Sequence, residues 1–354
     1  MDGKINKGEL MSFLSNTIDD IQRVINEQGD VIDTSQEKDT SSPMEVILKP
    51  EILDTSNVAE GEGNTQYRPQ TLESFVGQSK AKARLTDYIE GCKTMNETMP
   101  HIFLSAPPGH GKSLLSMIIA NMLDKKIVQC VGGDLKTEQT FVNKINECDG
   151  GVIFIDECNM IKKRVGFFML PVIEQFIING IKIKPFTLIL ATTHRGDLSK
   201  DLDALIQRCE LDISLEHYIE EELQQIIKQF KNKQYSEIQI SEHIYKSISK
   251  NCRQTPRLAR RLLKNYIFTQ DFDKVLQQNQ IVKNGLTLTD IKVLQYLLSF
   301  EKGASRNTLA NILRMKPQTY RYDIEPYLIF KNLIHIDNKT KLTEKGKLLL
   351  EKLK

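Results

Sequence analysis

Long apolar runs are absent from this sequence of 354 residues. No stretch approaches the roughly 18 consecutive apolar residues that a membrane-spanning helix needs, so we expect no membrane span. The first residues, Met-Asp-Gly-Lys-Ile-Asn-Lys-Gly-Glu, lack the hydrophobic core of a secretory signal peptide. With 40% hydrophobic and 27% charged residues, the composition is typical of a soluble globular protein. We therefore expect the protein to remain in the cytoplasm.

Paired cysteines are also missing. The sequence contains no Cys-x-x-Cys pair and no cysteine at a metal-ligand spacing from a histidine, which argues against a zinc site and a disulfide framework. We expect reduced thiols in a cytosolic protein. The six cysteines are Cys92, Cys130, Cys148, Cys158, Cys209 and Cys252.

The net charge of +2 conceals an asymmetry along the chain. Residues 1–66 carry fourteen acidic residues and five lysines or arginines, a net charge of −9, which leaves +11 for residues 67–354. A basic body is typical of proteins that bind nucleic acid, although the same charge spread evenly would serve only solubility.

The acidic leader at 1–66 contains one regular element. Apolar residues at spacings of three and four over 8–28 predict an amphipathic helix, and residues 30–65 are rich in Ser, Thr, Asp, Glu, Pro and Gly, which indicates a flexible tether. Such a helix can dock on a partner protein, pair with a second copy of itself, or fold back on its own body. The sequence leaves these three alternatives open.

The rest of the chain is organised around a glycine-containing turn. The apolar run from His101 to Leu104 precedes Ser-Ala-Pro-Pro-Gly-His-Gly-Lys-Ser at 105–113, and a helical pattern starts at Leu114. In such an arrangement the backbone N–H groups converge on an anion and the helix dipole favours negative charge. The turn predicts a P-loop, in which Lys112 reaches the β- and γ-phosphates and Ser113 binds Mg²⁺.

Strands alternate with helices around this loop. The further strands are predicted at 127–131, 152–155 and 186–191, and the helices at 79–95, 138–147 and 162–178. This alternation implies a parallel sheet covered on both faces, with ligands bound at the carboxyl ends of its strands. We expect this α/β domain to occupy residues 67–215.

An acidic pair closes one of the predicted strands. Asp156 and Glu157 follow the apolar run at 152–155, about forty residues after the P-loop. Asp156 can hold Mg²⁺ through water, and Glu157 can act as the general base on the attacking water. Alternatively, both acids cap the next helix. The P-loop favours ATP hydrolysis over this structural role.

Two further units follow the α/β domain. Apolar positions recur at helical spacing over 216–285, which predicts a helical lid. Over 286–354 the pattern predicts helices near 289–300, 305–313 and 317–330, and then a β-like pair, the order of a winged helix. This last unit holds thirteen lysines or arginines and seven acidic residues.

Several motifs together resemble the RuvB family of AAA+ motors, which drive branch migration of Holliday junctions. The matching segments are Tyr67 to Leu72, Phe75 to Gln78, the P-loop, Phe154 to Glu157, Pro185 to Leu188, Ala191 to Thr193, Gln254 to Leu263 and Glu325 to Leu328. Their joint occurrence in this order is specific, although each is common alone. The resemblance implies an α/β P-loop AAA+ domain, a helical lid and a C-terminal winged-helix domain.

The resemblance also implies roles for individual residues. Thr193, beside Thr192, would sense the γ-phosphate or the water, and Arg208 would be an arginine finger inserted into the neighbouring subunit's site. Arg257 would be the second sensor, in the lid. The residues expected around the adenine are Tyr67, Arg68, Val76 and Tyr218. Those expected around the phosphates are Pro108, Gly109, His110, Gly111, Lys112, Ser113 and Leu114.

Two features depart from the family's plan. The segment between Glu174 and Pro185 is shorter than the hairpin with which the family grips its partner RuvA. A short hairpin around Asn179 and Gly180 can still form, but docking on a standard RuvA is doubtful. The leader at 1–66 is an addition, so either the partner differs or the leader recruits it.

The winged helix is expected to contact DNA. Phosphate contacts hold DNA without reading its sequence, as a motor requires, whereas the alternative is a basic face used only for packing or for a protein partner. The residues placed for such contacts are Arg314, Lys316, Arg321, Lys339 and Lys341.

We therefore interpret the chain as an ATP- and Mg²⁺-dependent translocase on double-stranded or branched DNA, assembled as a homo-oligomeric ring that we expect to be hexameric. The alternative is an ATP-switched loader or adaptor that recruits a partner to DNA and uses hydrolysis for release. A third hypothesis, a scaffold without turnover, predicts ATP binding without phosphate release, and the presence of every catalytic residue type argues against it.

Overall fold

The computed structural model describes residues 70–353 except residues 194, 199 and 301. Two compact units are distinguished, with the division between Leu286 and Thr287. The predicted helix at 8–28, the tether, Tyr67 and Arg68 lie outside the described residues. No described helix is both long enough and apolar enough to cross a membrane.

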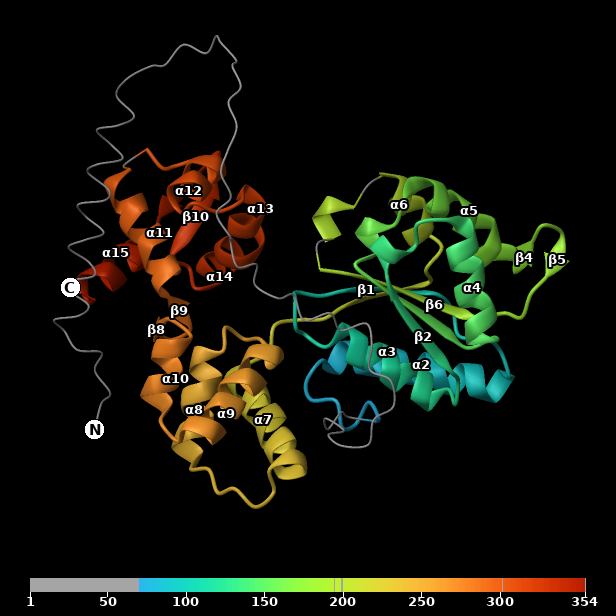
Figure 1. The fold of residues 1–354 in the computed structure, drawn as a ribbon, viewed down its shortest axis with the longest axis horizontal. Coiled ribbons are helices and arrows are strands. Elements are labelled where there is room, and N and C mark those ends of the chain that lie inside the picture. The colour runs from blue at the N-terminus through green and yellow to red at the C-terminus, as the bar shows by residue number, and fades with distance from the viewer. Residues whose placement is uncertain (1–69, 194, 199, 301, 354) are drawn as a thin grey trace, which may run out of the picture. The chain divides into compact units, whose positions relative to one another are not determined.

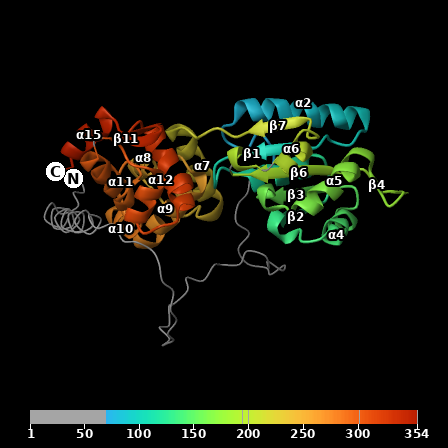
Figure 2. The ribbon, with the colours of Figure 1, turned by 90° about the horizontal axis from the view of Figure 1, so that it is seen from above.

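The first unit contains a five-stranded sheet in which every neighbouring pair is parallel (Figure 1). Across the sheet the strands are β2 (Ile127–Val131), β3 (Val152–Asp156), β6 (Thr187–Thr192), β1 (Ile102–Ser105) and β7 (Leu211–Ser214). Figure 2 shows them succeeding one another in this order. Because parallel strands end at a common edge, the residues that follow β1, β3 and β6 come together there.

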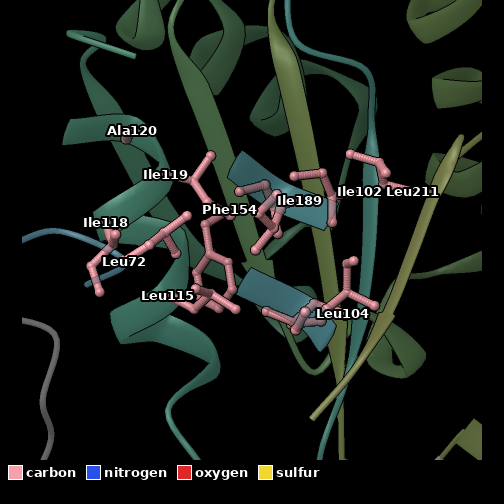
Figure 3. Packing of buried hydrophobic residues seen from close by; sticks show 14 of the residues in the cluster. Leu72, Ile102, Leu104, Leu115, Ile118, Ile119, Ala120, Phe154, Ile189 and Leu211 are labelled. Carbon is pink, nitrogen blue, oxygen red and sulfur yellow. The ribbon is translucent and has the colours of Figure 1, made fainter. Parts of the chain in front are cut away.

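Helices cover both faces of this sheet. They are α2 (Ser79–Met95), α3 (Lys112–Met122), α4 (Glu138–Cys148), α5 (Lys163–Gln175) and α6 (Lys200–Ile206). Successive side chains of a strand point to opposite faces, so Ile102 and Leu104 enter the core with α2 and α3, whereas Phe103 enters the core with α4, α5 and α6. Figure 3 shows Leu115 of α3 beside Phe154 of β3. The predicted two-faced parallel sheet is confirmed.

The helix predicted at 162–178 was too long. Helix α5 ends at Gln175, because Phe176 adopts a left-handed backbone with φ of 52°. Strands β4 (Ile177–Ile178) and β5 (Ile181–Lys182) then form an antiparallel hairpin. Asn179 and Gly180, with φ of 49° and 80°, make the tight turn that two positive φ angles allow. The expected short hairpin is therefore present.

Two elements of this sheet region were missed by sequence reasoning. Helix α6 and strand β7 have only seven and four residues. In β7 only Leu211 and Ile213 are buried, and its place in the sheet depends on pairing with β1. Short 3₁₀ turns lie at Gly132–Asp134, Cys158–Met160 and Arg195–Asp197.

The predicted helical lid is confirmed as the remainder of the first unit. Its helices are α7 (Glu220–Gln234), α8 (Glu242–Asn251), α9 (Pro256–Thr269) and α10 (Phe272–Gln278). They bury a core of their own, which includes Leu223, Ile227, Ile248, Leu262 and Leu263. Strand β8 (Ile281–Lys283) follows, and strand β9 (Leu286–Thr287) spans the division between the units.

The second unit has the predicted order of three helical segments and a β-hairpin. The segments are α11 (Leu288–Ser299), α12 (Arg306–Ile312) and a third formed by α13 (Pro317–Thr319), a π-helical turn (Tyr320–Ile324) and α14 (Glu325–Phe330). Strands β10 (Ile334–Asp337) and β11 (Lys339–Leu342) form the wing. A final helix that we did not predict, α15 (Glu344–Glu351), contributes Leu350 to the buried residues.

Candidate functional site

The loop that follows β1 has the predicted strand, turn and helix geometry. Gly109 and Gly111 have φ of 76° and 101°, which side chains rarely tolerate, and α3 begins at Lys112. A Cβ on Gly111 would lie 3.2 Å from the Phe75 ring. The loop backbone is therefore held close to the Phe75 ring at the start of α3, and the N–H groups at the start of a helix can bind an anion.

Lys112 lies buried inside this loop. Its Nζ donates a hydrogen bond to the carbonyl oxygen of Ala106 at 3.0 Å. Burial lowers the pKa of Lys112, and the negative charges of Asp156 and Glu157 partly offset this effect. The ammonium group therefore lies in the field of two carboxylates that come from a different strand.

The ends of β3 and β6 bring an acid and a hydroxyl together. Thr193 Oγ1 lies 3.0 Å from both carboxylate oxygens of Glu157 and donates to this group. Glu157 has a left-handed φ of 48°, and its backbone N–H donates to Asp156 Oδ1 at 3.0 Å. The left-handed conformation is uncommon for glutamate, and such residues gather at functional sites. The structure thus joins Lys112, Asp156, Glu157 and Thr193.

The second threonine after β6 has another partner. Thr192 is fully buried, and its Oγ1 donates to Asn159 Oδ1 at 3.3 Å. Of the two threonines, Thr193 is therefore the one that faces the acidic pair.

The loop at 76–78 is attached to the segment that leads into the lid. The Gln78 side chain donates to the Glu216 carbonyl oxygen and accepts from the Glu216 N–H, both at 2.8 Å. Val76 and Tyr218 are both buried, and the Tyr218 hydroxyl donates to the His110 carbonyl oxygen at 3.2 Å. Of the residues predicted for the adenine side, Tyr218 therefore adjoins the P-loop, whereas Val76 is buried two positions before Gln78. Sequence reasoning gave Gln78 no role, although it quoted the motif containing it.

A histidine pair that sequence reasoning missed also joins the P-loop to this segment. His110 Nε2 lies 3.2 Å from His217 Nδ1. Burial lowers the pKa of His110 to about 4 and also lowers the pKa of His217. In the neutral pair one ring donates its proton to the other.

The lid approaches the P-loop at the start of α9. A Cβ on Gly109 would lie 2.8 Å from Thr255 Cγ2 and 2.9 Å from Arg257 Cβ. Only glycine fits at this point, because it lets the lid come close enough to place Arg257 beside the P-loop. The pKa of Lys112 reflects the same closeness: burial is the main cause of its lowering, and the positive charge of Arg257 lowers it further.

Arg208 lies apart from this group. Its Nε is 2.7 Å from Glu174 Oε1, and its Nη1 donates to the carbonyl oxygen of Ala204 at 2.6 Å. The Nε–H is not aimed at the carboxylate, so the first contact is an ion pair without hydrogen-bond geometry. Among the described residues, Arg208 is not brought to its own chain's Lys112 and acids.

The predicted DNA-contacting residues all lie on the second unit. Arg314, Lys316, Arg321 and Lys339 are exposed. Lys341 in the wing is half-buried, and its Nζ lies 3.7 Å from Asp337 Oδ2. The first two residues follow α12 and the last two belong to the wing.

A bound divalent cation would have few protein ligands. No group of three or more His, Cys, Asp or Glu residues that could hold a metal occurs in the described part of the chain. Ser113, at the start of α3, and Asp156, at the end of β3, are oxygen donors at the same edge of the sheet. Mg²⁺ characteristically takes one or two protein oxygens together with substrate phosphates and water, so these residues fit it.

Comparisons with known proteins match three family models, all of the same family, to most of the described chain. The models for the Holliday junction DNA helicase RuvB P-loop domain, the RuvB AAA lid domain and the RuvB C-terminal winged helix domain match residues 67–210, 218–294 and 283–351. The order agrees with the fold described above.

Curated relatives and solved structures agree with this assignment. The Holliday junction branch migration complex subunit RuvB of Leuconostoc mesenteroides is 33% identical over 303 residues, 77% of this chain and 84% of the relative. The subunit of the same name from Enterococcus faecalis is 31% identical over 79% of this chain and 89% of its own length. The Thermotoga maritima RuvB Holliday junction branch migration motor superposes with a TM-score of 0.71 at 30% identity, covering 80% of this chain and 98% of that structure. This chain belongs to the RuvB family.

Proposed function

We propose that this protein is an ATP-driven motor that moves Holliday junctions or related branched DNA intermediates. The observation that carries the proposal is the convergence of Lys112, Asp156, Glu157 and Thr193 at one edge of the sheet, behind a glycine-rich anion cradle. These groups are the ones that hydrolysis of a nucleoside triphosphate requires. The family's C-terminal winged helix domain follows on the same chain.

Each group has a role in hydrolysis. The backbone N–H groups at 109–114 and the Lys112 ammonium bind the phosphates, and Ser113 and Asp156 hold Mg²⁺. The cation, when bound, neutralises negative charge on the phosphates. Glu157 accepts a proton from the attacking water, and the Thr193 hydroxyl fixes its carboxylate in place. Val76, Tyr218, Tyr67 and Arg68 surround the adenine.

Two arginines connect the ATPase site to the lid and to the neighbouring subunit. Arg257 contacts the γ-phosphate from the lid, which moves with the state of the nucleotide. Arg208 acts in the neighbouring subunit's site, where it stabilises charge in the transition state. This role requires a closed ring of subunits, for which we propose six.

We assign each part of the chain a separate role. The ATPase domain is 67–215, the lid 216–285 and the winged helix 286–354, with the acidic leader at 1–66. The winged helix holds DNA phosphates through Arg314, Lys316, Arg321, Lys339 and Lys341, without reading sequence. The hairpin at 177–182 has only two residues in each strand, so we propose that docking on a standard RuvA is weakened and that residues 8–28 recruit the partner. The protein would act in the cytoplasm, where recombining DNA lies.

The test is ATP hydrolysis with and without a synthetic four-way junction, followed by an assay of junction movement. We expect turnover that the junction stimulates and that Glu157→Gln abolishes. The matched variant Glu147→Gln changes an exposed acid of α4 and should behave as the unmodified protein. Turnover that DNA does not change would overturn the motor. Hydrolysis stimulated by DNA without junction movement would instead support a loader that recruits a partner.

A further inference from the structure

Two contacts among the described residues hold one side of the Arg208 guanidinium, an ion pair and a hydrogen bond. Glu174 pairs with Nε at 2.7 Å, and the Ala204 carbonyl oxygen accepts from Nη1 at 2.6 Å. No described residue accepts a hydrogen bond from Nη2. About a third of the side chain, 31%, is exposed. Within the part of the chain that the structure describes, the arginine is thus held by two contacts, while Nη2 has no hydrogen-bond partner and can meet a ligand from another subunit.

The carboxylate that holds it is itself on a rigid support. Glu174 lies in the last turn of α5, and its neighbour Ile173 is buried in the core. His101 Nε2 donates to the Ile173 carbonyl oxygen at 3.0 Å, while His101 Nδ1 accepts from the Leu188 N–H at 3.1 Å. The two bonds fix the tautomer of His101 and tie the end of α5 to the sheet. The backbone beside Glu174 is therefore anchored to the parallel sheet.

We propose that Glu174 is the positioning residue of the Arg208 finger, and that it presents the Nη2 edge to the phosphates bound in the neighbouring subunit. This inference rests on the proposed function, in which Arg208 acts across the subunit boundary. A free arginine side chain samples many rotamers, and ordering it at each encounter lowers the rate. A guanidinium already held by the Nη1 hydrogen bond and by the ion pair with Glu174 loses less freedom when it engages the nucleotide.

Glu174→Gln tests the proposal because it keeps the shape of the side chain and removes its charge. We expect kcat to fall about three- to tenfold, the factor that corresponds to ordering one long side chain. KM for ATP should not change, since ATP is bound by the other subunit's own loop. Glu174→Asp keeps the charge and should recover part of the loss. The control Glu138→Gln breaks a comparable ion pair, with Arg164 at 3.0 Å, and should leave kcat unchanged.

Mixed rings separate positioning in trans from a local defect. Full-length Glu174→Gln protein is diluted into an excess of Glu157→Gln protein, whose own sites are inactive but whose fingers are intact. Each active site then receives a normal finger, so turnover per active subunit should equal that of unmodified protein diluted in the same way. A defect that persists on dilution overturns the proposal, as does a Glu174→Gln ring with kcat equal to or above the unmodified value.

Arg208→Ala distinguishes failure of the proposal from failure of the proposed function. Its turnover should be lower than that of Glu174→Gln and should recover on the same dilution. If Arg208→Ala alone retains full turnover, Arg208 is not a finger and the inference falls with that assignment. If Arg208→Ala behaves as expected and Glu174→Gln does not, only the role of Glu174 is refuted.

Discussion

Replacing Gly109 by alanine inserts one methyl group between the P-loop and the lid. The new Cβ would lie 2.8 Å from Thr255 Cγ2 and 2.9 Å from Arg257 Cβ. The optimal separation of non-bonded carbon atoms is about 3.5–4.0 Å, so the lid must be displaced by roughly 0.7 Å or more. The left-handed backbone adds about 1–2 kcal/mol for any residue with a Cβ. The variant therefore carries a backbone cost and a displacement of Arg257.

Gly180→Ala supplies a control for the backbone cost. Gly180 has φ of 80°, close to the 76° of Gly109, but no atom lies within 4 Å of the point that a methyl group would occupy there. Gly180→Ala should lose about 1–2 kcal/mol of unfolding free energy in urea titrations, and Gly109→Ala should lose at least as much, because its methyl group also meets the lid. Only Gly109→Ala should lose ATP turnover, by about 10–100-fold, since displacements near 1 Å have effects of this size.

Thr255→Ser in the Gly109→Ala background shows whether the lid is the cause. Serine lacks Cγ2 but keeps the hydroxyl, which in Thr255 donates to the Arg253 carbonyl oxygen at 3.1 Å. Part of the lost turnover should return. If none returns, the methyl group acts on the bound phosphates instead. Equal turnover of Gly109→Ala and Gly180→Ala would refute the reasoning altogether.

Three further changes test other parts of the chain. Thr193→Val removes the hydroxyl that lies 3.0 Å from both Glu157 oxygens, so steady-state assays should show kcat lower by about 10–100-fold and restored largely by Thr193→Ser. Folding lowers the pKa of His110 from 6.5 to about 4, so between these two pH values the unfolded chain binds more protons than the folded one. The free energy of unfolding therefore decreases as the pH falls through this range, by up to about 1.4 kcal/mol per pH unit from this residue. His110→Leu should remove this contribution to the pH dependence, as measured by urea unfolding at several pH values. Glu325→Gln removes the charge of the buried carboxylate that accepts from Arg306 Nε, and should cost about 1.5–3 kcal/mol of winged-helix stability; an unchanged unfolding midpoint would contradict this.

The sequence was most informative where structure or chemistry depends on adjacent residues. The predicted bounds of the helix Ser79–Met95 and the strand Ile127–Val131 are those observed. The P-loop was identifiable because its glycines, Lys112 and Ser113 lie within five consecutive positions. Asp156 and Glu157 were identifiable because they end an apolar run. Periodicity failed at the end of α5, where the apolar residues 176–178 continue the helical pattern but Phe176 turns the chain into a hairpin.

Strand β7 illustrates why short elements were missed. Only Leu211 and Ile213 are buried, and two apolar residues do not establish a period. Its position comes from hydrogen-bond pairing with β1, more than a hundred residues earlier in the chain. No local signal in the sequence can encode a partner at that distance.

The sequence by itself determined the fold class, the phosphate loop and the acidic pair, because backbone preference and apolar periodicity act between near neighbours. Only the tertiary structure decided which side chains those residues meet. His110 meets His217 across 107 positions, Gly109 fits against Arg257, and Glu174 holds Arg208. Each pair joins elements whose proximity follows from the order of strands in the sheet and the packing of helices on it, and that order is a property of the whole core.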